Sequence, residues 1–589
     1  MSYQFKIEMI KLKNGVEKPK GFRPTALNVI VGPNNSGKSH LLKEIRDAVY
    51  PRKDGAELIE KMLCQSIRFS EPGSYEELND AYLIDKRMIT TSQGYKNRDY
   101  CPPEISIDAN GYITSRNYSS TLSTSIEWHP FACSQISEFG LSSLLPYIGA
   151  SFVSYSGTTE RPLLAYGEKR YGLKDPQTNL LSTVQYNYEL QADLAEATKR
   201  LFGLDVALDI DSSEIAQFRT GSTFDNYRES KRNDGSKLGE LFDGSPLKDA
   251  GDGLKGFVAT YISLKIGNRP IVLIDEPETY LHPAQTYNLG KIIGESICPD
   301  TQLFVATHSS TLIEGLASSL SKSNQNDISL IKLNGKEASD EGDSARIITG
   351  ESLYSFLHDP KLSHSRALDA LFADRITLVE SDADRIVYQQ LIEKVGIDTK
   401  DALFIPTYSK DLMQHLAKFC NSIGTPCNAI VDLDLINNYE KLKAVVKVLE
   451  QKLLETKRTD FNRLHTPVKI INNVTDKCVD VTITDDEDKK RAKRTLYHNV
   501  LPCCKSCPEI FREAVRNFDR HREHLISNSG LLILSTGELE TIFEDNTHQR
   551  TNKNSWLSTG VQRIDETSVD ELNKLQITKD LRKLFSEIP

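Results

Sequence analysis

Residues 26–39 read ALNVIVGPNNSGKS, and this stretch decides the fold of the first half of the chain. The apolar run at 26–31 predicts a short buried strand, and the apolar positions from Leu41 to Val49 follow one face of a helix. Between them lies the pattern GxxxxGKS. Its glycines let backbone N–H groups curl around phosphates at the N-terminus of the helix. The sequence therefore predicts an α/β domain with a phosphate-binding P-loop.

Each residue type in this loop suits one part of a bound ATP. Lys38 is expected to reach the β- and γ-phosphates, and Ser39 is expected to hold Mg²⁺. Asn35 and Gly37 belong to the loop that surrounds the phosphates, so we assign them to nucleotide binding as well.

Two more apolar runs end in residues suited to nucleotide chemistry. The run at 271–274 leads into Asp275, a candidate metal ligand, and Glu276, which we expect to polarise the attacking water. The run at 303–306 leads to His308, a candidate contact of the γ-phosphate. Taken alone, this histidine is better explained as a packed polar residue. The order of the three motifs favours an ATPase site.

Acidic residues follow two apolar runs in the second half of the chain. Glu380 follows the run at 376–379, and Asp384 comes one helical turn later. Asp432 and Asp434 follow the run at 429–431. Parallel strands bring their C-terminal ends to one edge of a sheet, where carboxylates can bind Mg²⁺ or Mn²⁺. Either segment alone is also explained as a solvated turn or a helix cap.

The composition is that of an ordinary globular protein. Of 589 residues, 39% are hydrophobic and 26% are charged, and the mean hydropathy is −0.41. No stretch approaches the ~18 apolar residues of a membrane span, and the first residues do not resemble a secretion signal. We therefore expect a cytoplasmic protein with no membrane partner. The net charge of −10 argues against non-specific coating of nucleic acid.

The length predicts several domains. We expect an ATPase domain over 1–365, with insertions at about 60–150 and 175–245, and a second α/β domain over 366–589. Within the second insertion, apolar residues at helical spacing over 186–204 predict one arm of a helical insertion, a candidate dimerisation arm. The polar segment 321–350 is expected to be rich in loops.

Two features of the second half stay open. Cys503, Cys504 and Cys507 form half of a zinc site that Cys478 would have to help complete, or they are ordinary reduced thiols. The basic run KKRAKR at 489–494 is either an exposed charge block or a contact to nucleic acid.

The motifs of the first half resemble those of ABC-type ATPases of the SMC kind. GPNNSGKS, LIDEPETYLHP and VATHS are similar to their Walker A, Walker B and His-switch segments, and residues 249–254 resemble a degenerate signature motif. In that family the signature of one subunit completes the ATP site of another, so the resemblance implies a composite site across a dimer. Asp252 stands where the family has serine. Because a carboxylate repels the γ-phosphate unless a cation intervenes, slow hydrolysis is expected.

The second half resembles a Toprim fold. The order of ATPase and Toprim resembles the OLD (overcoming lysogenization defect) nucleases, including Gabija-type and retron-associated antiphage members, through residues 366–385 and 531–540. The resemblance implies that Glu380, Asp432 and Asp434 bind a first metal. It offers Glu538 and Glu540 for a second metal, with Glu540 counted as catalytic, and Lys553 as a stabiliser of charge on the phosphate. Ser381 replaces the usual glycine.

The nucleotide-binding motifs and the acidic residues of the second half together lead us to expect an ATP-regulated, divalent-metal-dependent DNA endonuclease. In it, an ATPase dimer gates a two-metal Toprim site. The resemblance alone implies antiphage defence. It also implies a homodimer or higher oligomer and a regulatory partner such as a helicase or a reverse transcriptase with its RNA–DNA product. The alternative is a non-nucleolytic, SMC-like DNA-binding ATPase clamp or sensor in DNA repair. The preference for DNA over RNA and the sign of the ATP effect stay open.

Overall fold

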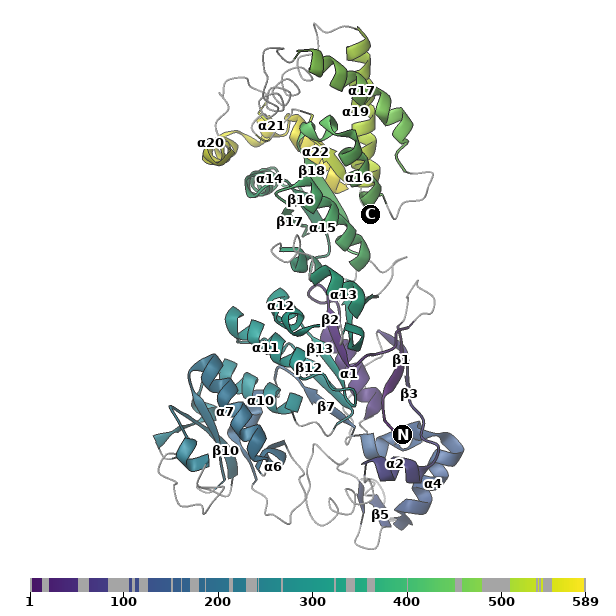
Figure 1. Ribbon diagram of the computed structural model, residues 1–589, viewed down its shortest axis with the longest axis vertical. Coiled ribbons are helices and arrows are strands. Elements are labelled where there is room, and N and C mark those ends of the chain that lie inside the picture. Colours follow the sequence, from purple (N-terminus) through teal and green to yellow (C-terminus); the bar gives the residue numbers. More distant parts are fainter. Residues whose placement is uncertain are drawn as a thin grey trace. The chain divides into compact units, whose positions relative to one another are not determined.

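The computed structural model divides into two compact units, Met1–Ser355 and Phe356–Pro589 (Figure 1). It describes residues 3–12, 21–50, 63–82, 105–107, 112–115, 125–149, 152–159, 161–169, 180–185, 187–210, 215–228, 241, 243–265, 269–321, 325–334, 345–357, 366–399, 401–450, 458–478, 509–535, 539, 542–543 and 553–586. None of the described helices is both long and apolar enough to cross a bilayer.

A six-stranded sheet forms the centre of the first unit. Its order is β15-β14-β2-β13-β12-β7, and all neighbours are parallel except β14 and β15. The three strands expected from the motifs, β2, β12 and β13, are adjacent and buried along their whole length. Their continuous apolar runs suit a sheet that is covered on both faces. The strands are β2 (Leu27–Val31), β7 (Val153–Ser156), β12 (Ile271–Asp275), β13 (Gln302–Ala306), β14 (Ile328–Leu333) and β15 (Ala345–Thr349).

The segment 321–350 corrects an expectation. Instead of being mainly loop, it supplies β14 and β15, and β14 is buried throughout beside β2. The strand ISLIKL at 328–333 contains the polar residues Ser329 and Lys332, and both are buried within it. Ser329 meets its requirement by donating a hydrogen bond of 2.8 Å to Asn28 Oδ1 inside the sheet.

Helices cover this sheet. α11 and α12 pack side by side so closely that a Cβ on Gly290 would lie 2.1 Å from the Leu312 carbonyl oxygen (Figure 1). The helices are α1 (Lys38–Val49), α10 (Asp252–Lys265), α11 (Pro283–Glu295), α12 (Ser310–Ser319) and α13 (Gly350–Leu357).

The first insertion shares its core with the N-terminal residues. β1 (Ile7–Leu12) and β3 (Cys64–Phe69) form an antiparallel pair, and Phe5 stacks on Phe152 with ring centroids 4.5 Å apart. Buried residues of these strands, of α1 and of the insertion helices form one hydrophobic cluster. The remaining elements are α2 (Tyr75–Tyr82), α4 (Trp128–Phe139), α5 (Leu145–Ile148) and the antiparallel strands β4 (Ile105–Ile107), β5 (Tyr112–Ser115) and β6 (Ser125–Glu127).

The second insertion contains the expected helix, but a β-sheet follows it where further helix was expected. α7 (Tyr188–Phe202) is capped by Asn187 and packs on α10 and β9. The next residues form an antiparallel pair of β9 (Asp205–Asp209), which is buried throughout, and β10 (Ile215–Gly221), whose buried and less buried residues alternate. The same region holds α6 (Leu180–Gln185), β8 (Glu168–Lys169) and β11 (Ser245–Pro246).

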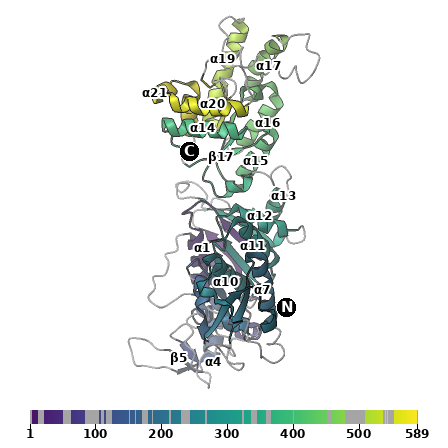
Figure 2. The ribbon, with the colours of Figure 1, turned by 90° about the vertical axis from the view of Figure 1, so that its left-hand side faces the viewer.

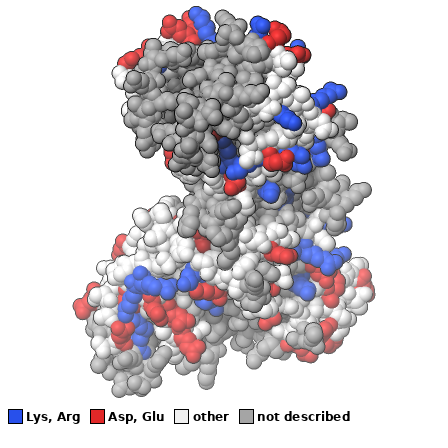
Figure 3. All heavy atoms as spheres, turned by 45° about the horizontal axis from the view of Figure 1, so that its top comes forward, with Lys and Arg blue, Asp and Glu red and all other residues white. Residues whose placement is uncertain are grey.

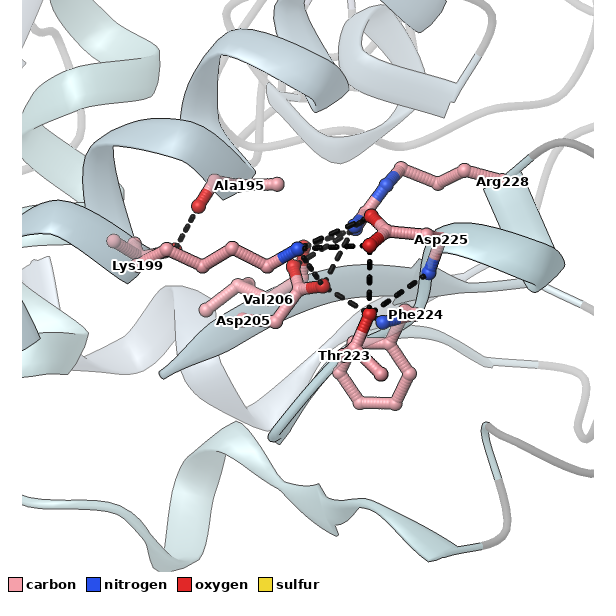
Figure 4. Close-up of polar contacts among 9 residues, drawn as sticks. Ala195, Lys199, Asp205, Val206, Thr223, Phe224, Asp225 and Arg228 are labelled. Atoms are coloured by element: carbon pink, nitrogen blue, oxygen red, sulfur yellow. Dashed lines mark hydrogen bonds and ion pairs between the residues drawn. The ribbon is translucent and has the colours of Figure 1, made fainter. Parts of the chain in front are cut away.

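An ion-pair network joins α7 to this sheet (Figure 4). The buried carboxylate of Asp205 lies 2.6 Å from the Arg228 guanidinium and 3.1 Å from Lys199 Nζ. Asp225 contacts the same two cations, and the hydrogen bonds from Arg228, Thr223 and Lys199 lower its pKa. The network thus holds α7 and the start of β9 together within the insertion, and the assignment of this insertion as a dimerisation arm stays a prediction.

The second unit has a four-stranded parallel sheet in the order β17-β16-β18-β19. Helices α14 and α20 lie side by side and share a hydrophobic core that includes Val387 and Trp556 (Figure 2). The strands are β16 (Ile376–Val379), β17 (Leu403–Pro406), β18 (Cys427–Val431) and β19 (Leu531–Ile533). The helices are α14 (Asp382–Val395), α15 (Lys410–Ile423), α16 (Tyr439–Leu449), α17 (Phe461–Cys478), α19 (Glu509–His524), α20 (Lys553–Glu566), α21 (Val569–Leu572) and α22 (Gln576–Ser586).

Candidate functional site

The phosphate-binding loop lies between β2 and α1. Asn35 and Gly37 adopt positive φ angles of 62° and 94°, which turn the backbone so that the loop curls over the start of α1. Lys38 is buried, and its Nζ donates hydrogen bonds of 2.9 Å to the carbonyl oxygens of Gly32 and Pro33. Burial lowers the pKa of Lys38, whereas the carboxylates at the end of β12 raise it. The ammonium is therefore held within the loop that is predicted to surround the phosphates.

Ser39 and Asp275 meet as the sequence predicts. Ser39 Oγ donates a hydrogen bond of 2.9 Å to Asp275 Oδ1, although 236 residues separate them in the chain. The contact follows from the sheet order, because β13 alone lies between β2 and β12. Burial raises the pKa of Asp275, and the hydroxyl of Ser39 opposes this shift. P-loop enzymes bind Mg²⁺ through a hydroxyl group and a carboxylate, and Ser39 and Asp275 carry these two groups.

Arg161 is a residue of this region that sequence reasoning missed. It is buried, and its guanidinium donates hydrogen bonds to the carbonyl oxygens of Asp275 and Glu276, at 2.5 and 2.7 Å. Burial lowers the pKa of Arg161. Glu276 adopts a positive φ of 46°, so these bonds hold an uncommon backbone turn in place. No sequence pattern around Arg161 marks it, because its partners lie on a strand far away in the chain.

His308 lies between two glutamates. Its Nδ1 is 3.4 Å from Glu276 Oε1 and 3.3 Å from Glu278 Oε1. Glu278 was not singled out from the sequence, yet it is buried and accepts hydrogen bonds from Thr307 Oγ1 at 2.6 Å and from the His308 N–H at 3.0 Å. Burial raises the pKa of Glu278, and its bond from Thr307 opposes this. Glu278 therefore positions the loop that carries His308.

Asp252 begins α10 and forms an ion pair with Lys255, its Oδ1 lying 2.9 Å from Lys255 Nζ. The side chain of Asp252 is exposed, whereas that of Lys255 is mostly covered. The negative charge of Asp252 thus has a cation beside it.

The second unit brings its predicted acids to one edge of the sheet. β16 and β18 are parallel neighbours, and Glu380 Oε1 accepts a hydrogen bond of 3.1 Å from the backbone N–H of Asp432. Asp434, two residues later, forms an ion pair with Lys410. Lys410 Nζ is also 3.9 Å from Glu380 Oε1. A lysine that the sequence analysis did not select therefore stands among the carboxylates.

Ser381 and Asp384 shape the turn after β16. Ser381 caps α14, because its Oγ accepts a hydrogen bond from the Asp384 N–H and donates one of 2.5 Å to Asp384 Oδ2. Serine thereby takes a defined capping function at the position where the resembling family has glycine. Asp384 is buried, and its assignment as a metal ligand stays a prediction.

The donor chemistry at this edge suits a hard divalent cation, because carboxylate oxygens converge there around a positive group. Within the described part of the chain, however, no three acidic, histidine or cysteine side chains come close enough to hold a metal by themselves. Glu538 and Glu540, the basic run at 489–494 and the cluster of Cys503, Cys504 and Cys507 lie outside the described residues. Lys553 is the first residue of α20.

Family models match both units. Residues 165–314 match the family described as "AAA domain, putative AbiEii toxin, Type IV TA system". Residues 371–434, which include Glu380, Asp432 and Asp434, match "Overcoming lysogenization defect protein-like, TOPRIM domain".

Solved structures of SMC head domains are also similar, whereas no curated protein matches. The SMC head bound to the C-terminal winged-helix domain of ScpA is 11% identical, with a TM-score of 0.32 over 59% of this chain and 99% of that one. The SMC head from Thermotoga maritima is 12% identical, with a TM-score of 0.27 over 58% and 98%. The SMC head with an extended coiled coil, bound to the C-terminal domain of ScpA derived from Pyrococcus furiosus, is 12% identical, with a TM-score of 0.30 over 60% and 99%.

The two family matches follow one another along the chain in the same order as the two structural units. The chain thus carries a P-loop ATPase domain followed by a Toprim domain, and this combination is that of an OLD-family ATPase–Toprim fusion.

Proposed function

We propose that this protein is an ATP-regulated, divalent-metal-dependent DNA endonuclease. The observation that carries the proposal is that Glu380, Asp432 and Asp434 follow two neighbouring parallel strands, where the Asp432 backbone bonds to Glu380 and Lys410 lies beside Glu380 and Asp434. Toprim units that cut nucleic acid need carboxylates at this edge.

Each residue of the proposed nuclease site has an assigned function in cleavage. The backbone N–H of Asp432 donates a hydrogen bond to Glu380 Oε1. This bond fixes the Glu380 carboxylate relative to the end of the neighbouring strand. Glu380, Asp432 and Asp434 are the candidates to hold the metal, joined in the proposal by Glu538 and Glu540. A bound divalent cation would supply an activated water and neutralise charge on the phosphodiester. Lys553 is proposed to stabilise the charge that develops on the phosphate.

ATP is proposed to act through the first unit. Lys38 would exchange its two loop carbonyls for the β- and γ-phosphates, and Ser39 and Asp275 would hold Mg²⁺. Glu276 would orient the attacking water and His308 would contact the γ-phosphate. The proposed assembly is a homodimer in which the segment around Asp252 faces the nucleotide of a second copy.

DNA is the proposed substrate, and antiphage defence is the proposed setting. On the face drawn in Figure 3, basic and acidic side chains of the described residues lie beside one another. Contacts to a polyanion on that face would therefore depend on individual lysines and arginines, and they should weaken as salt is raised. A regulatory partner, either a helicase or a reverse transcriptase with its RNA–DNA product, belongs to the same proposal.

The test is cleavage of supercoiled plasmid by the full chain with Mg²⁺ or Mn²⁺, with and without ATP. We expect Glu380→Gln to lower cleavage by at least about 10²-fold while ATP binding stays unchanged. Asp411→Asn is the matched control, because Asp411 lies on α15 of the same unit in an exposed pair with Lys441. This control should cut like the wild type.

The outcomes separate two functions. Cleavage that is lost in Glu380→Gln alone supports the nuclease, and the comparison with and without ATP gives the sign of the coupling. Equal cleavage by wild type and Glu380→Gln would contradict the proposal. Salt-sensitive DNA binding without cutting under any condition would favour the DNA-repair clamp instead.

A further inference from the structure

The ammonium of Lys410 lies beside two of the carboxylates that are predicted to bind a metal, Glu380 and Asp434. It forms an ion pair with Asp434 and lies 3.9 Å from Glu380 Oε1. The three side chains are mostly covered, with exposed fractions of 19% for Lys410, 22% for Glu380 and 15% for Asp434. Poor access to water strengthens the attraction between these charges compared with a pair on the surface.

The backbone delivers Lys410 to this place. The loop between β17 and α15 is bound to the loop after β16, because the N–H groups of Thr407 and Tyr408 donate to the carbonyl oxygens of Val379 and Glu380, at 2.9 and 2.8 Å. Ser409 then caps α15 through the Leu412 N–H at 3.1 Å. Lys410 is consequently fixed at the first position of α15, beside the acids.

This position is electrostatically unfavourable for a lysine in isolation. The N-terminus of a helix carries partial positive charge, so cations are favoured at the opposite end. Here the two carboxylates compensate the ammonium. A cation placed against the helix dipole and directed at acids from two other strand ends points to a function within the acidic site.

We propose that Lys410 is a displaceable resident cation of the Toprim site, which balances Glu380 and Asp434 and competes with the divalent metal for them. The proposal rests on the proposed nuclease function. When metal binds, the ammonium leaves Asp434 and, on its flexible four-carbon stem, becomes available to a phosphate of the nucleic acid. Lys410 thus weakens metal binding in the free protein and contacts a phosphate once the metal is bound.

The decisive measurement is Mn²⁺ binding by the full chain without nucleotide or DNA, followed by the electron paramagnetic resonance signal of free Mn²⁺. Lys410→Met keeps the length of the stem and removes the charge. We expect it to bind Mn²⁺ on the order of tenfold more tightly than the wild type, and we expect Glu380→Gln to abolish this binding.

Two variants control for charge in general. Lys410→Arg keeps a cation in place, so its Mn²⁺ affinity should be no higher than that of the wild type. Lys441→Met removes a lysine whose ammonium is 3.6 Å from Asp411 in an exposed pair, and its affinity should be unchanged. Thermal unfolding of each variant shows whether it folds.

The failure modes are distinguishable. Mn²⁺ binding that depends on Glu380 but is equal or weaker in Lys410→Met overturns the competition and leaves the nuclease proposal standing. Absence of Glu380-dependent Mn²⁺ binding from every variant overturns both. In the loaded state, binding of a short DNA duplex in Ca²⁺ should weaken in Lys410→Met more than in Lys441→Met, and equal binding by the two would remove the phosphate contact from the proposal.

Discussion

At the scale of single residues, the ATPase site contains a positioning group that its motifs do not reveal. Glu278 accepts hydrogen bonds from Thr307 and from the His308 backbone, and it lies 3.3 Å from the His308 ring. One of its oxygens, Oε2, is buried without a hydrogen-bond partner. A buried carboxylate that is only partly satisfied costs stability, so its placement points to a function in holding His308.

We predict that Glu278→Ala slows ATP turnover by about 10²-fold and leaves the Kd for ATP nearly unchanged, because a misplaced catalytic group costs rate more than binding. Glu278→Gln, which can still accept from Thr307, should recover most of the rate. Phosphate release and titration with a fluorescent ATP analogue measure the two quantities.

If Glu278 acts through His308, a double variant with His308→Ala should be no slower than His308→Ala alone. Additive losses would contradict the assignment of Glu278 as a positioning residue.

A second residue-scale prediction concerns Asp252. If its carboxylate faces the nucleotide of a second copy, Asp252→Ser should raise ATP turnover several-fold, because one repulsive charge is removed. Lys255→Ala should lower turnover, since it leaves Asp252 without its cation at 2.9 Å. Lys291→Ala, which removes an exposed lysine paired with Glu295 on α11, is the control for charge. Equal turnover in all four proteins would remove Asp252 from the site.

At the scale of elements, glycines set the distance between α11 and α12. A Cβ on Gly290 would meet the Leu312 carbonyl oxygen at 2.1 Å, and one on Gly315 would meet the Tyr287 carbonyl oxygen at 1.9 Å. The helices approach along both of these positions. Since α11 follows the turn after β12 and α12 follows His308, the contact of these helices also fixes the loops that carry Glu276 and His308.

We predict that Gly290→Ala lowers the free energy of unfolding of the ATPase unit by about 1–3 kcal/mol, because the added methyl group forces the two helices apart. Gly256→Ala is the matched control, since it lies within α10 and a Cβ there would meet nothing within 4 Å. It should raise stability by about 1 kcal/mol, because alanine is the better helix former. Thermal unfolding of both variants tests this, and equal shifts would contradict the packing argument.

At the scale of the whole molecule, the two sites lie on different units, each with its own sheet and its own hydrophobic core. Every ATPase motif falls within Met1–Ser355, and Glu380, Asp432 and Asp434 fall within Phe356–Pro589. The predicted nucleotide site and the predicted acidic metal site therefore lie on separate units of the chain. Any influence of ATP on cleavage is a coupling free energy between two sites.

Differential scanning calorimetry can assign the ligands to the units. We predict that ATP with Mg²⁺ at about 100 times its Kd stabilises the first unit by about 2.7 kcal/mol and raises its unfolding temperature. Lys38→Ala should lose this shift, whereas Glu380→Gln should keep it. A shift that survives in Lys38→Ala would contradict the assignment of the phosphate-binding loop.

What the sequence by itself determined is local. The strand, loop and helix around Lys38 are contiguous, so their order alone predicts the phosphate-binding loop. The meeting of Ser39 with Asp275, and of Glu380 with Asp432, was also predictable, because parallel strands bring their C-terminal ends to one edge. Periodicity predicted α7 but not the strand β9 that follows it, since β9 begins and ends in aspartate and yet is buried along its whole length.

Only the tertiary structure decided which distant groups complete each site. Arg161 bonds to a backbone atom 114 residues away, Glu278 contacts Thr307 after the following strand, and Lys410 reaches Asp434 from the first position of α15. No local sequence pattern predicts these pairings, because one side chain that bonds to a distant group does not change the hydrophobic periodicity of its own segment. The motifs identify the residues suited to the chemistry. Which other residues hold these motif residues in place depends on how the strand ends pack against one another.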